Sequence, residues 1–309
     1  QRQQRRRRRY RLQSDPDQHP RPRLRHPEVR HVLVPGPVRD SFTEDNVAWR
    51  AGLDWKPVAD MMFYANVAKG YKAGNFVNIT AIFSSSFEPV PQESVLAYEA
   101  GFKASTQDRR LQVTGAGFYY DYKDKQLTGF RDGGVFGNIN SVISIPESRV
   151  IGGEVEAILQ PADGLTVRAG ATYIDTKVTG DFLARDSVGN ISNRRGESFP
   201  GTPQWAVIGD SEYEFPVWSG WSAYVGGNVA YRSESRASFG DDPAFQIPGY
   251  TLIDLRAGFR GEDGRYQVQF YGRNISDKYY FVTAQSTADN VTHIAGMPAT
   301  YGVTFSARF

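Results

Sequence analysis

Apolar and polar residues alternate along most of the chain after residue 46. In the segment 46–56, Val47, Trp49, Ala51, Leu53 and Trp55 are apolar and most of the residues between them are small or polar. The segment 221–232 has the same period of two. This period predicts β-strands with one apolar and one polar face. The predicted strands cover the ranges 46–56, 61–71, 94–104, 110–122, 142–160, 165–177, 204–215, 221–232, 249–261, 265–274 and 300–309.

The connections between these strands are of two kinds that alternate along the chain. Short turns rich in Pro, Gly and Asp occupy 56–60, 105–109, 161–164, 216–220 and 261–264. Long polar loops occupy 72–92, 123–141, 178–203, 233–248 and 275–299. Short turns at one end and long loops at the other are typical of outer-membrane β-barrels. The Greek-key connections of a soluble sandwich give no reason for this sorting.

Strand length and aromatic placement favour the same interpretation. A tilted strand of about 9 to 11 residues crosses the hydrocarbon layer of a membrane, and the predicted strands reach or exceed that length. Rings cluster near strand ends, as in "FYYDY" (118–122) and "DKYYF" (277–281), where interfacial aromatic girdles are found. The sequence therefore predicts an all-β fold, an antiparallel up-and-down portion of a transmembrane β-barrel.

Composition limits the chemistry of the protein. The chain has no cysteine, which excludes disulfides and thiolate metal sites. Glu154 and Glu156 are two residues apart on a strand, the placement of a glycosidase pair, but the apolar residues between and after them indicate that both line a polar lumen. We expect no enzyme activity and no cofactor. His293 is the one histidine after residue 45, so no metal site is expected.

The first 45 residues differ from the remainder. They contain twelve arginines, no lysine and six prolines. The run "RRRRR" lacks the interleaved aromatics of a nucleic-acid stacking platform, and no nucleic-acid partner is expected. We interpret 1–45 as a disordered segment or as the product of a wrongly defined reading frame, and 46–309 as the ordered domain.

Seven motifs resemble, in order, successive strands from the C-terminal half of TonB-dependent outer-membrane receptors. They are "YANVAKGYKAGNF" (64–76), "YEAGFKA" (98–104), "FYYDYKDKQ" (118–126), "GGEVE" (152–156), "PGYTLIDLRAGFR" (248–260), "YGRNISDKYY" (271–280) and "YGVTFSARF" (301–309). In that family a 22-stranded barrel encloses a plug domain and takes up scarce ligands, most often ferric siderophores. The resemblance implies a bacterial outer-membrane location, contact with the lipid bilayer, and coupling to the TonB energy complex through a plug region.

The same resemblance gives the terminal strand a second role. Tyr301, Phe305 and Phe309 lie on one face of "YGVTFSARF". The family's last strand, with its terminal aromatic, resembles the signal that the outer-membrane assembly machinery reads. Eleven predicted strands are half of the family's 22, and nothing before residue 46 resembles a plug. An open sheet would leave unpaired edges that lipid does not tolerate, so we expect the chain to be a fragment of such a receptor.

Candidate ligand contacts lie in the long loops. Arginine suits anionic ferric chelates because its planar fork pairs with carboxylate or catecholate oxygens. The candidate residues are Arg194, Arg195, Arg236, Tyr279, Tyr280 and His293. Two other hypotheses remain open from the residues: a passive diffusion porin, and a soluble all-β carbohydrate-binding protein.

Overall fold

The protein was analysed as a computed structural model, which describes residues 41–76, 89–134, 137–261, 264–287 and 290–308. Eleven strands of the described residues form one continuous antiparallel path, each paired with the next along the chain. They are β1 (Trp49–Val58), β2 (Met61–Lys72), β5 (Glu93–Ser105), β6 (Leu111–Asp132), β7 (Asn138–Ala162), β8 (Leu165–Val178), β11 (Trp205–Trp218), β12 (Trp221–Arg232), β15 (Tyr250–Gly261), β16 (Tyr266–Arg273) and β19 (Thr300–Ala307). The predicted all-β, up-and-down fold is confirmed.

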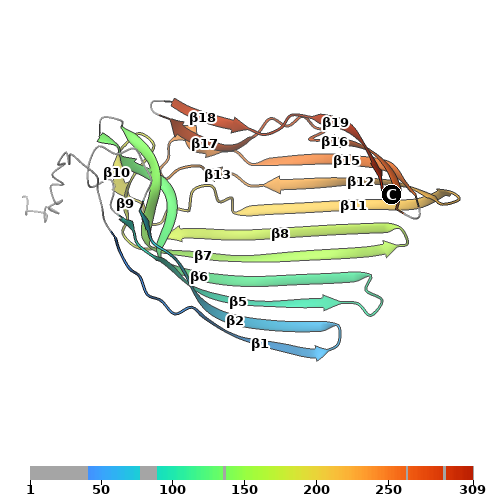
Figure 1. Cartoon of the computed structure of the whole chain (residues 1–309), viewed down its shortest axis with the longest axis horizontal. Helices are drawn as coiled ribbons and strands as arrows, with labels where there is room; N and C mark the ends of the chain where they lie inside the picture. The colour runs from blue at the N-terminus through green and yellow to red at the C-terminus, as the bar shows by residue number, and fades with distance from the viewer. Residues whose placement is uncertain (1–40, 77–88, 135–136, 262–263, 288–289, 309) are drawn as a thin grey trace, which may run out of the picture.

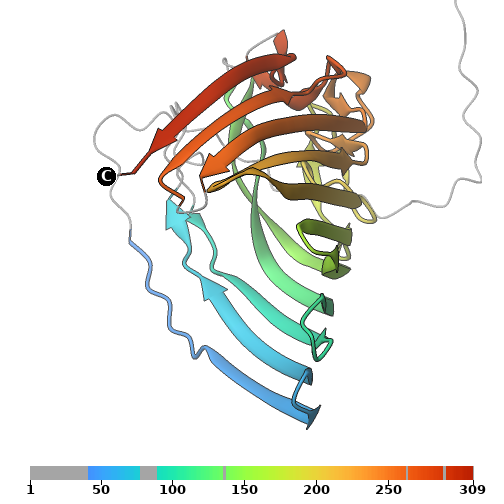
Figure 2. The same ribbon diagram turned by 90° about the vertical axis from the view of Figure 1, so that its right-hand side faces the viewer.

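The sheet curves into a trough. Seen from the turn end, the strands follow an arc from β1 to β19, and the concave side is open (Figure 2). The short turns and the C-terminus lie at one end of the strands, and the long connections gather at the other, as Figure 1 shows. We call these the turn end and the loop end. No helix within the described part of the chain is long and apolar enough to cross a membrane.

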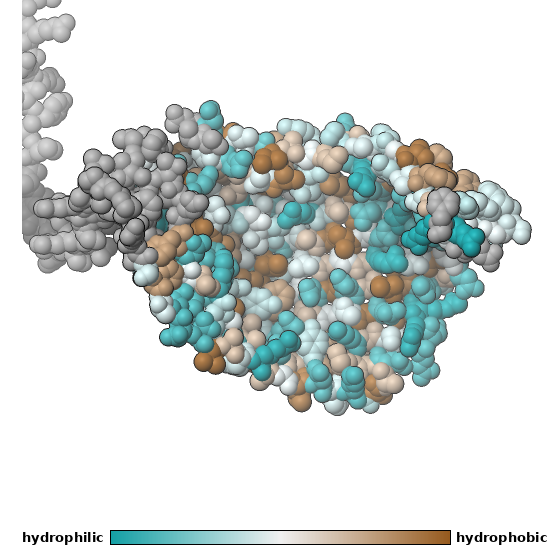
Figure 3. Space-filling view, viewed as in Figure 1, coloured by the Kyte–Doolittle hydropathy of each residue, from teal (hydrophilic) through white to brown (hydrophobic). Residues whose placement is uncertain are grey.

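Strand register separates two faces. Asp210 of β11 lies opposite Asn228 of β12, which lies opposite Asp254 of β15, and all three belong to the concave face. The neighbouring rows, such as Gly209 with Val229, belong to the convex face. Hydrophilic residues are spread along the length of the concave face, which is the one seen in Figure 3. The convex face carries many of the exposed large apolar side chains, and this division is typical of a barrel with a polar lumen and an apolar lipid-facing surface.

A row of ion pairs crosses the concave face from β11 to β15. Arg256 of β15 lies with Nη1 2.7 Å from Asp210 Oδ2 and Nε 2.8 Å from Glu212 Oε2. Arg260 lies with Nη1 2.5 Å from Glu214 Oε2. These contacts join two strands that are not neighbours, because β12 lies between them. Glycine at position 226 makes room for this, since a Cβ there would lie only 3.0 Å from the Arg256 guanidinium carbon.

The last strand presents its apolar face outward. Tyr301 and Phe305 are 69% and 67% exposed and share the convex face with Val303. Their side chains are available to lipid, and their role in assembly stays a prediction. Phe309, the third residue of the predicted assembly signal, lies outside the described residues.

One predicted loop is wrong. The range 123–141 is mostly strand, because β6 and β7 continue as a paired ladder from Lys123 opposite Glu147 to Asp132 opposite Asn138. The polar composition of 123–126 suggested a loop, but the extension buries Ile143 and Ile145 in an apolar cluster at the loop end. Packing of those two residues favours the strand over the loop that local composition indicates.

The other long connections carry short elements of their own. They are β3 (Asn75–Phe76) with β4 (Pro89–Val90), β9 (Leu183–Arg185) with β10 (Ile191–Asn193), β13 (Ser235–Arg236) with β14 (Gln246–Ile247), the 3-10 helix η3 (Pro243–Phe245), and β17 (Phe281–Thr287) with β18 (Asn290–Ala295).

Candidate ligand site at the loop end

The loop end is a packed assembly of several connections. One apolar cluster joins β7 and β8 to the connections that follow β8 and β12; it consists of Ile143, Ile145, Val178, Phe182, Ala184, Phe199 and Phe239. A second cluster joins β6 to the connections around η3 and β17; it consists of Phe130, Phe245, Ile247 and Ala284. Segments more than a hundred residues apart in the sequence therefore share a core. The connections have defined positions relative to the barrel wall.

Hydrogen bonds reinforce this packing. The carboxylate of Glu197 accepts from Arg194 Nη1 at 3.2 Å and from the backbone N–H of Gly240 at 2.8 Å. Ser187 donates its hydroxyl to Asp242 Oδ2 at 2.7 Å. Glu197 and Ser187 belong to the connection after β8, and Gly240 and Asp242 belong to the connection after β12. The two connections are thus held together by charged and polar contacts as well as by apolar ones.

Arg194, one of the predicted ligand residues, is part of this scaffold. Its side chain is only 4% exposed. It lies 3.2 Å from Glu197 and 3.8 Å from Asp186, and its Nε donates to the Ala184 carbonyl at 3.3 Å. A buried guanidinium needs such partners, because an unpaired buried charge is strongly destabilising. The position of Arg194 favours a role in holding the connection in shape.

The other predicted ligand residues lie at the same end and differ in exposure. Arg195 and Arg236 are more than half exposed and pair with Asp181 and Asp241 respectively. Tyr279 is 72% exposed.

Tyr280 and His293 are held by neighbours. The Tyr280 ring lies 4.5 Å from the Tyr250 ring, measured between centroids. The His293 ring lies 4.5 Å from the Phe281 ring, and its Nε2 is 2.8 Å from the Ala244 carbonyl oxygen. The structure therefore brings His293 to the connection that carries Arg236. Within the described residues, no group of three or more His, Asp or Glu side chains is arranged to hold a metal ion.

Sequence reasoning missed a charged cluster beneath these loops. Glu93 is buried and accepts from the backbone N–H of Gln126 at 2.8 Å and from Lys125 Nζ at 3.3 Å. Lys125 Nζ also lies 4.1 Å from the centroid of the Tyr122 ring. A lysine among tyrosines and acids in "YDYKDK" was a signal for a cation held by rings and carboxylates, but the expected loop at 123–141 obscured it.

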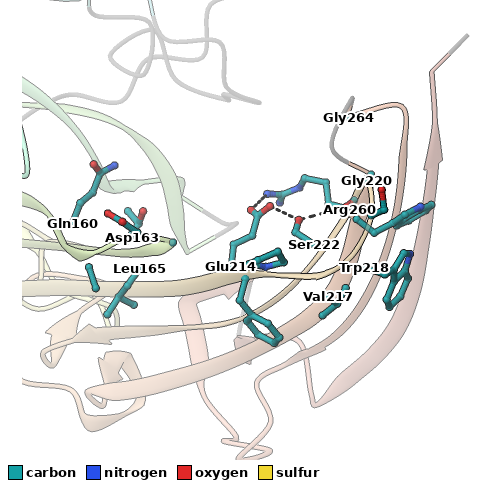
Figure 4. A pocket seen from close by; sticks show the side chains of 18 of the residues that line it. Gln160, Asp163, Leu165, Glu214, Val217, Trp218, Gly220, Ser222, Arg260 and Gly264 are labelled. Atoms are coloured by element: carbon teal, nitrogen blue, oxygen red, sulfur yellow. Dashed lines mark hydrogen bonds and ion pairs between the residues drawn. The ribbon is translucent and has the colours of Figure 1, made fainter.

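A hollow of about 1180 Å³ lies at the opposite, turn end. Glu214, Ser222 and Arg260 line it and contact one another, and Trp218 lies beside them (Figure 4). Glu214 and Arg260 form an ion pair here, so the contacts strengthen the barrel wall. None of the predicted ligand residues lines this hollow.

We expect acidification to destabilise the β9–β10 hairpin only below the ordinary pKa of an aspartate. The Asn193 side chain donates to Asp181 at 3.0 Å and Arg195 lies beside it, which lowers the pKa of Asp181 below its ordinary 3.8. A carboxyl whose pKa falls on folding stabilises the folded form above its unfolded pKa and loses this effect as the pH falls through its folded pKa. Protection of the amides of residues 181–195, measured relative to the intrinsic exchange rate at each pH, should stay unchanged from about pH 7 to pH 5 and fall below the ordinary Asp pKa of about 4.

The variant Asp181→Asn is the control for that measurement. It should show faster exchange at neutral pH and a weaker acid dependence. Loss of protection near pH 6 in the unaltered protein would contradict the assignment to Asp181.

The curved sheet with a polar concave face, an apolar convex face and packed loops at one end defines a barrel wall of the outer-membrane class. Comparison with known proteins identifies the family. Residues 12–275 match the family model described as "TonB dependent receptor-like, beta-barrel", and the chain belongs to this family. Its members are non-enzymatic transporters of the bacterial outer membrane. The match begins inside the arginine- and proline-rich segment, and the division at residue 45 stays a prediction.

Individual relatives are distant. The chain is 27% identical over 217 residues to the metal-pseudopaline receptor CntO of Pseudomonas aeruginosa, covering 68% of this chain and 27% of that protein. It is 25% identical over 274 residues to the probable TonB-dependent siderophore receptor PiuA of Acinetobacter baumannii, covering 84% and 34%. The chain thus spans about a third or less of the length of these relatives.

Solved structures share the fold. The ferric yersiniabactin uptake receptor FyuA from Yersinia pestis superposes with a TM-score of 0.66 at 18% identity, over 84% of this chain and 37% of that one. The siderophore receptor PiuA from Acinetobacter baumannii superposes with a TM-score of 0.62 at 19% identity, over 84% and 35%.

Proposed function

We propose that this chain forms barrel wall and extracellular loops of a receptor that takes up a ferric siderophore or a similar metal chelate across the outer membrane. The observation that carries the proposal is the packed loop end, which presents Arg195, Arg236 and Tyr279 to solvent on a fixed scaffold. The relatives named for siderophores and metallophores support this ligand class. The ligand itself would be substrate, and no resident metal is required.

The chemistry of the exposed residues fits an anionic chelate. Arginine donates paired hydrogen bonds to carboxylate or catecholate oxygens, and charge-assisted bonds of this kind are the strong ones. Among the described residues, each exposed arginine forms one ion pair, at the surface, and such pairs contribute little. A multiply charged anionic ligand can therefore take the place of Asp181 beside Arg195, or of Asp241 beside Arg236, at a small cost in free energy. Tyr279 adds an exposed ring for stacking on the ligand.

Energy coupling and assembly follow from family membership. We propose that uptake depends on the TonB complex, acting through a plug region, and that Tyr301, Phe305 and Phe309 form the signal read by the outer-membrane assembly machinery. The lipid bilayer contacts the convex face. We keep 1–45 as a segment separate from the barrel domain 46–309.

Uptake of radioactive iron tests the proposal. Cells that carry the gene, starved of iron, should accumulate ⁵⁵Fe from at least one chelate in a panel of catecholate, hydroxamate and carboxylate siderophores. Cells without the gene should not, and neither should cells that have the gene but lack TonB. Equal uptake with and without TonB would favour a passive porin, and absence of uptake for every chelate would overturn the ligand class.

The variant Arg195→Ala should weaken chelate binding. Loss of one charge-assisted contact costs about 1.5–3 kcal/mol, roughly a tenfold to hundredfold rise in Kd. Equilibrium binding of the ferric chelate to the receptor purified from outer membranes measures this. Arg265→Ala, at the turn end, is the matched control and should bind normally. Normal binding by Arg195→Ala, Arg236→Ala and Tyr279→Ala alike would exclude these residues as the ligand site.

A further inference from the structure

A hollow of about 790 Å³ lies at the loop end between the connection after β8 and the connection after β12. We call it the flank pocket. Most of its lining is polar and uncharged, and it includes two aromatic residues, Phe199 and Tyr231. The lining residues that matter here are Ser198, Thr202, Gln204, Tyr231, Ser235 and Gln246.

One side of the flank pocket comes from the convex face of the barrel wall. Tyr231 pairs with Val207 and Thr251 on the convex face, and Tyr231 lines the pocket. Its neighbour Arg232 belongs to the concave face and lines a smaller adjoining hollow with Tyr250; Ser233 and Ser235 line both hollows. Of the candidate ligand residues, Arg236 alone lines the pocket, and binding in the pocket goes beyond the proposed uptake function.

Aromatic rings place the pocket near the edge of the membrane. Trp205 follows Gln204 directly, is 46% exposed, and its ring lies 4.9 Å from that of Tyr173. Tyr231 is 40% exposed on the same convex face. Tryptophan and tyrosine on the lipid-facing surface mark the interface between hydrocarbon and head groups. The pocket lies at the level where the head groups of outer-leaflet lipids begin.

Five polar side chains that line the pocket are available for hydrogen bonds to a ligand. Within the described part of the chain, the side chains of Ser198, Thr202, Gln204, Ser235 and Gln246 make no hydrogen bond to protein. Hydroxyl and amide groups both donate and accept. Five such groups around one hollow can therefore bind a ligand that also offers many donors and acceptors.

The walls of the pocket are fixed before any ligand arrives. The backbone N–H of Gly201 donates to the Arg236 carbonyl at 2.6 Å, and that of Trp205 donates to Ser233 Oγ at 3.0 Å. Glu197 joins the two connections as described above. Groups that are already held in place lose little entropy when a ligand binds.

The charged side chains of the pocket lining disfavour the binding of an anion. Arg236, the arginine of the lining, is paired with Asp241. The lining also contains Glu197 and Glu234, so its carboxylates outnumber its arginine. A phosphate or carboxylate in this pocket would meet two carboxylates and a single guanidinium group. An uncharged ligand rich in hydroxyl groups meets no such repulsion.

We propose that the flank pocket binds an uncharged saccharide unit. Sugar hydroxyls match the Ser, Thr and Gln side chains, and the apolar C–H face of a pyranose ring can lie on the exposed ring of Tyr231. The unit can come from the head group of an outer-leaflet glycolipid or from a free oligosaccharide. The level of the pocket at the membrane edge favours the glycolipid.

Saturation-transfer NMR tests this proposal on the protein expressed from its own gene, purified from outer membranes in a polyoxyethylene detergent that contains no sugar. The probes are free trisaccharides of glucose, galactose or mannose, and alkyl glycosides with the same sugars as head groups. Binding of alkyl glycosides alone assigns the source to a glycolipid, and binding of both kinds assigns it to saccharide in general. Absence of transfer to every probe overturns the proposal.

Two variants locate the site. Ser198→Ala with Gln246→Ala removes hydrogen-bonding groups from both walls and should weaken saccharide binding about tenfold or more. Ser219→Ala, in a turn at the other end of the barrel, should bind like the unaltered protein. Both side chains of the double variant are exposed, so the fold should persist, and an unchanged thermal melting curve checks this. Unchanged saccharide affinity in the double variant would overturn the assignment to the flank pocket.

Discussion

Replacing Val303 with arginine should destabilise the membrane-inserted protein by about 2–4 kcal/mol, the cost of an arginine on the lipid face of a barrel near the midplane. Val303 lies in the middle of β19, is 62% exposed, and pairs with Phe270 of β16 on the convex face. An arginine there meets hydrocarbon and must bend toward the head groups or draw water in. Urea titration of the protein in liposomes, followed by the fluorescence of its tryptophans, measures the free energy of unfolding.

Thr304→Arg is the matched control. Thr304 is the next residue of the same strand and lies opposite Gln269 on the concave face. Its side chain faces the polar side of the wall, so arginine there should change the free energy of unfolding by less than about 0.5 kcal/mol. Equal destabilisation by the two variants would contradict the assignment of the faces.

Replacing Arg256 with methionine should destabilise the barrel by roughly 2 kcal/mol. Removing one partner of a fully buried ion pair costs about 3–5 kcal/mol. We expect a smaller cost here because the Arg256 side chain is 22% exposed. Among the described residues, Asp210 then keeps an ion pair with Arg168, at 3.5 Å, and Glu212 keeps one with Arg260, at 3.7 Å. The same urea titration measures the effect.

Arg168→Met is the control, because it also removes an arginine from the concave face. Arg168 is 55% exposed and makes one contact of 3.5 Å with Asp210. Exposed pairs of this kind contribute about 0–1 kcal/mol. Arg256→Met should therefore be clearly the more harmful variant. A larger effect of Arg168→Met would contradict the arrangement of ion pairs between β11 and β15.

The sequence predicts the strands of the barrel wall well because the physical signal there is simple. A strand between lipid and a polar lumen must alternate at every residue, and β12 and β19 do so clearly. Short turns can also be predicted from the sequence, since Gly164 and Gly220 take a positive φ that favours glycine. The membrane imposes these patterns residue by residue, independently of distant contacts.

The loop end is less predictable because its structure depends on contacts between distant segments. The extension of β6 and β7 is stabilised by packing of Ile143 and Ile145 against residues after β8, which periodicity within 123–141 cannot reveal. Arg194 and Arg195 are adjacent and equally basic, yet one is buried in a scaffold and the other is exposed. Both arginines pair with acids, so their difference arises from the packing of the folded connection around Arg194.

The flank pocket was not predictable for a similar reason. Ser198 and Gln246 are ordinary loop residues in the sequence, and only the contact between two connections places them around one hollow. The candidate ligand residues were found from residue type and loop position alone. Their assignment to ligand therefore stays a prediction until binding is measured.

The measurement that most directly tests the central claim is a spin-label accessibility scan along β12 in outer membranes. The 309-residue chain has no cysteine, so each introduced cysteine carries the only label on this chain. Labels at Val225, Gly227 and Val229 should be accessible to oxygen dissolved in lipid, and labels at Tyr224 and Asn228 to a water-soluble nickel complex. Alternation with a period of two is the expected result. Access of the nickel complex to both sets, or to neither, would contradict a barrel wall with one face in lipid and one on a polar lumen.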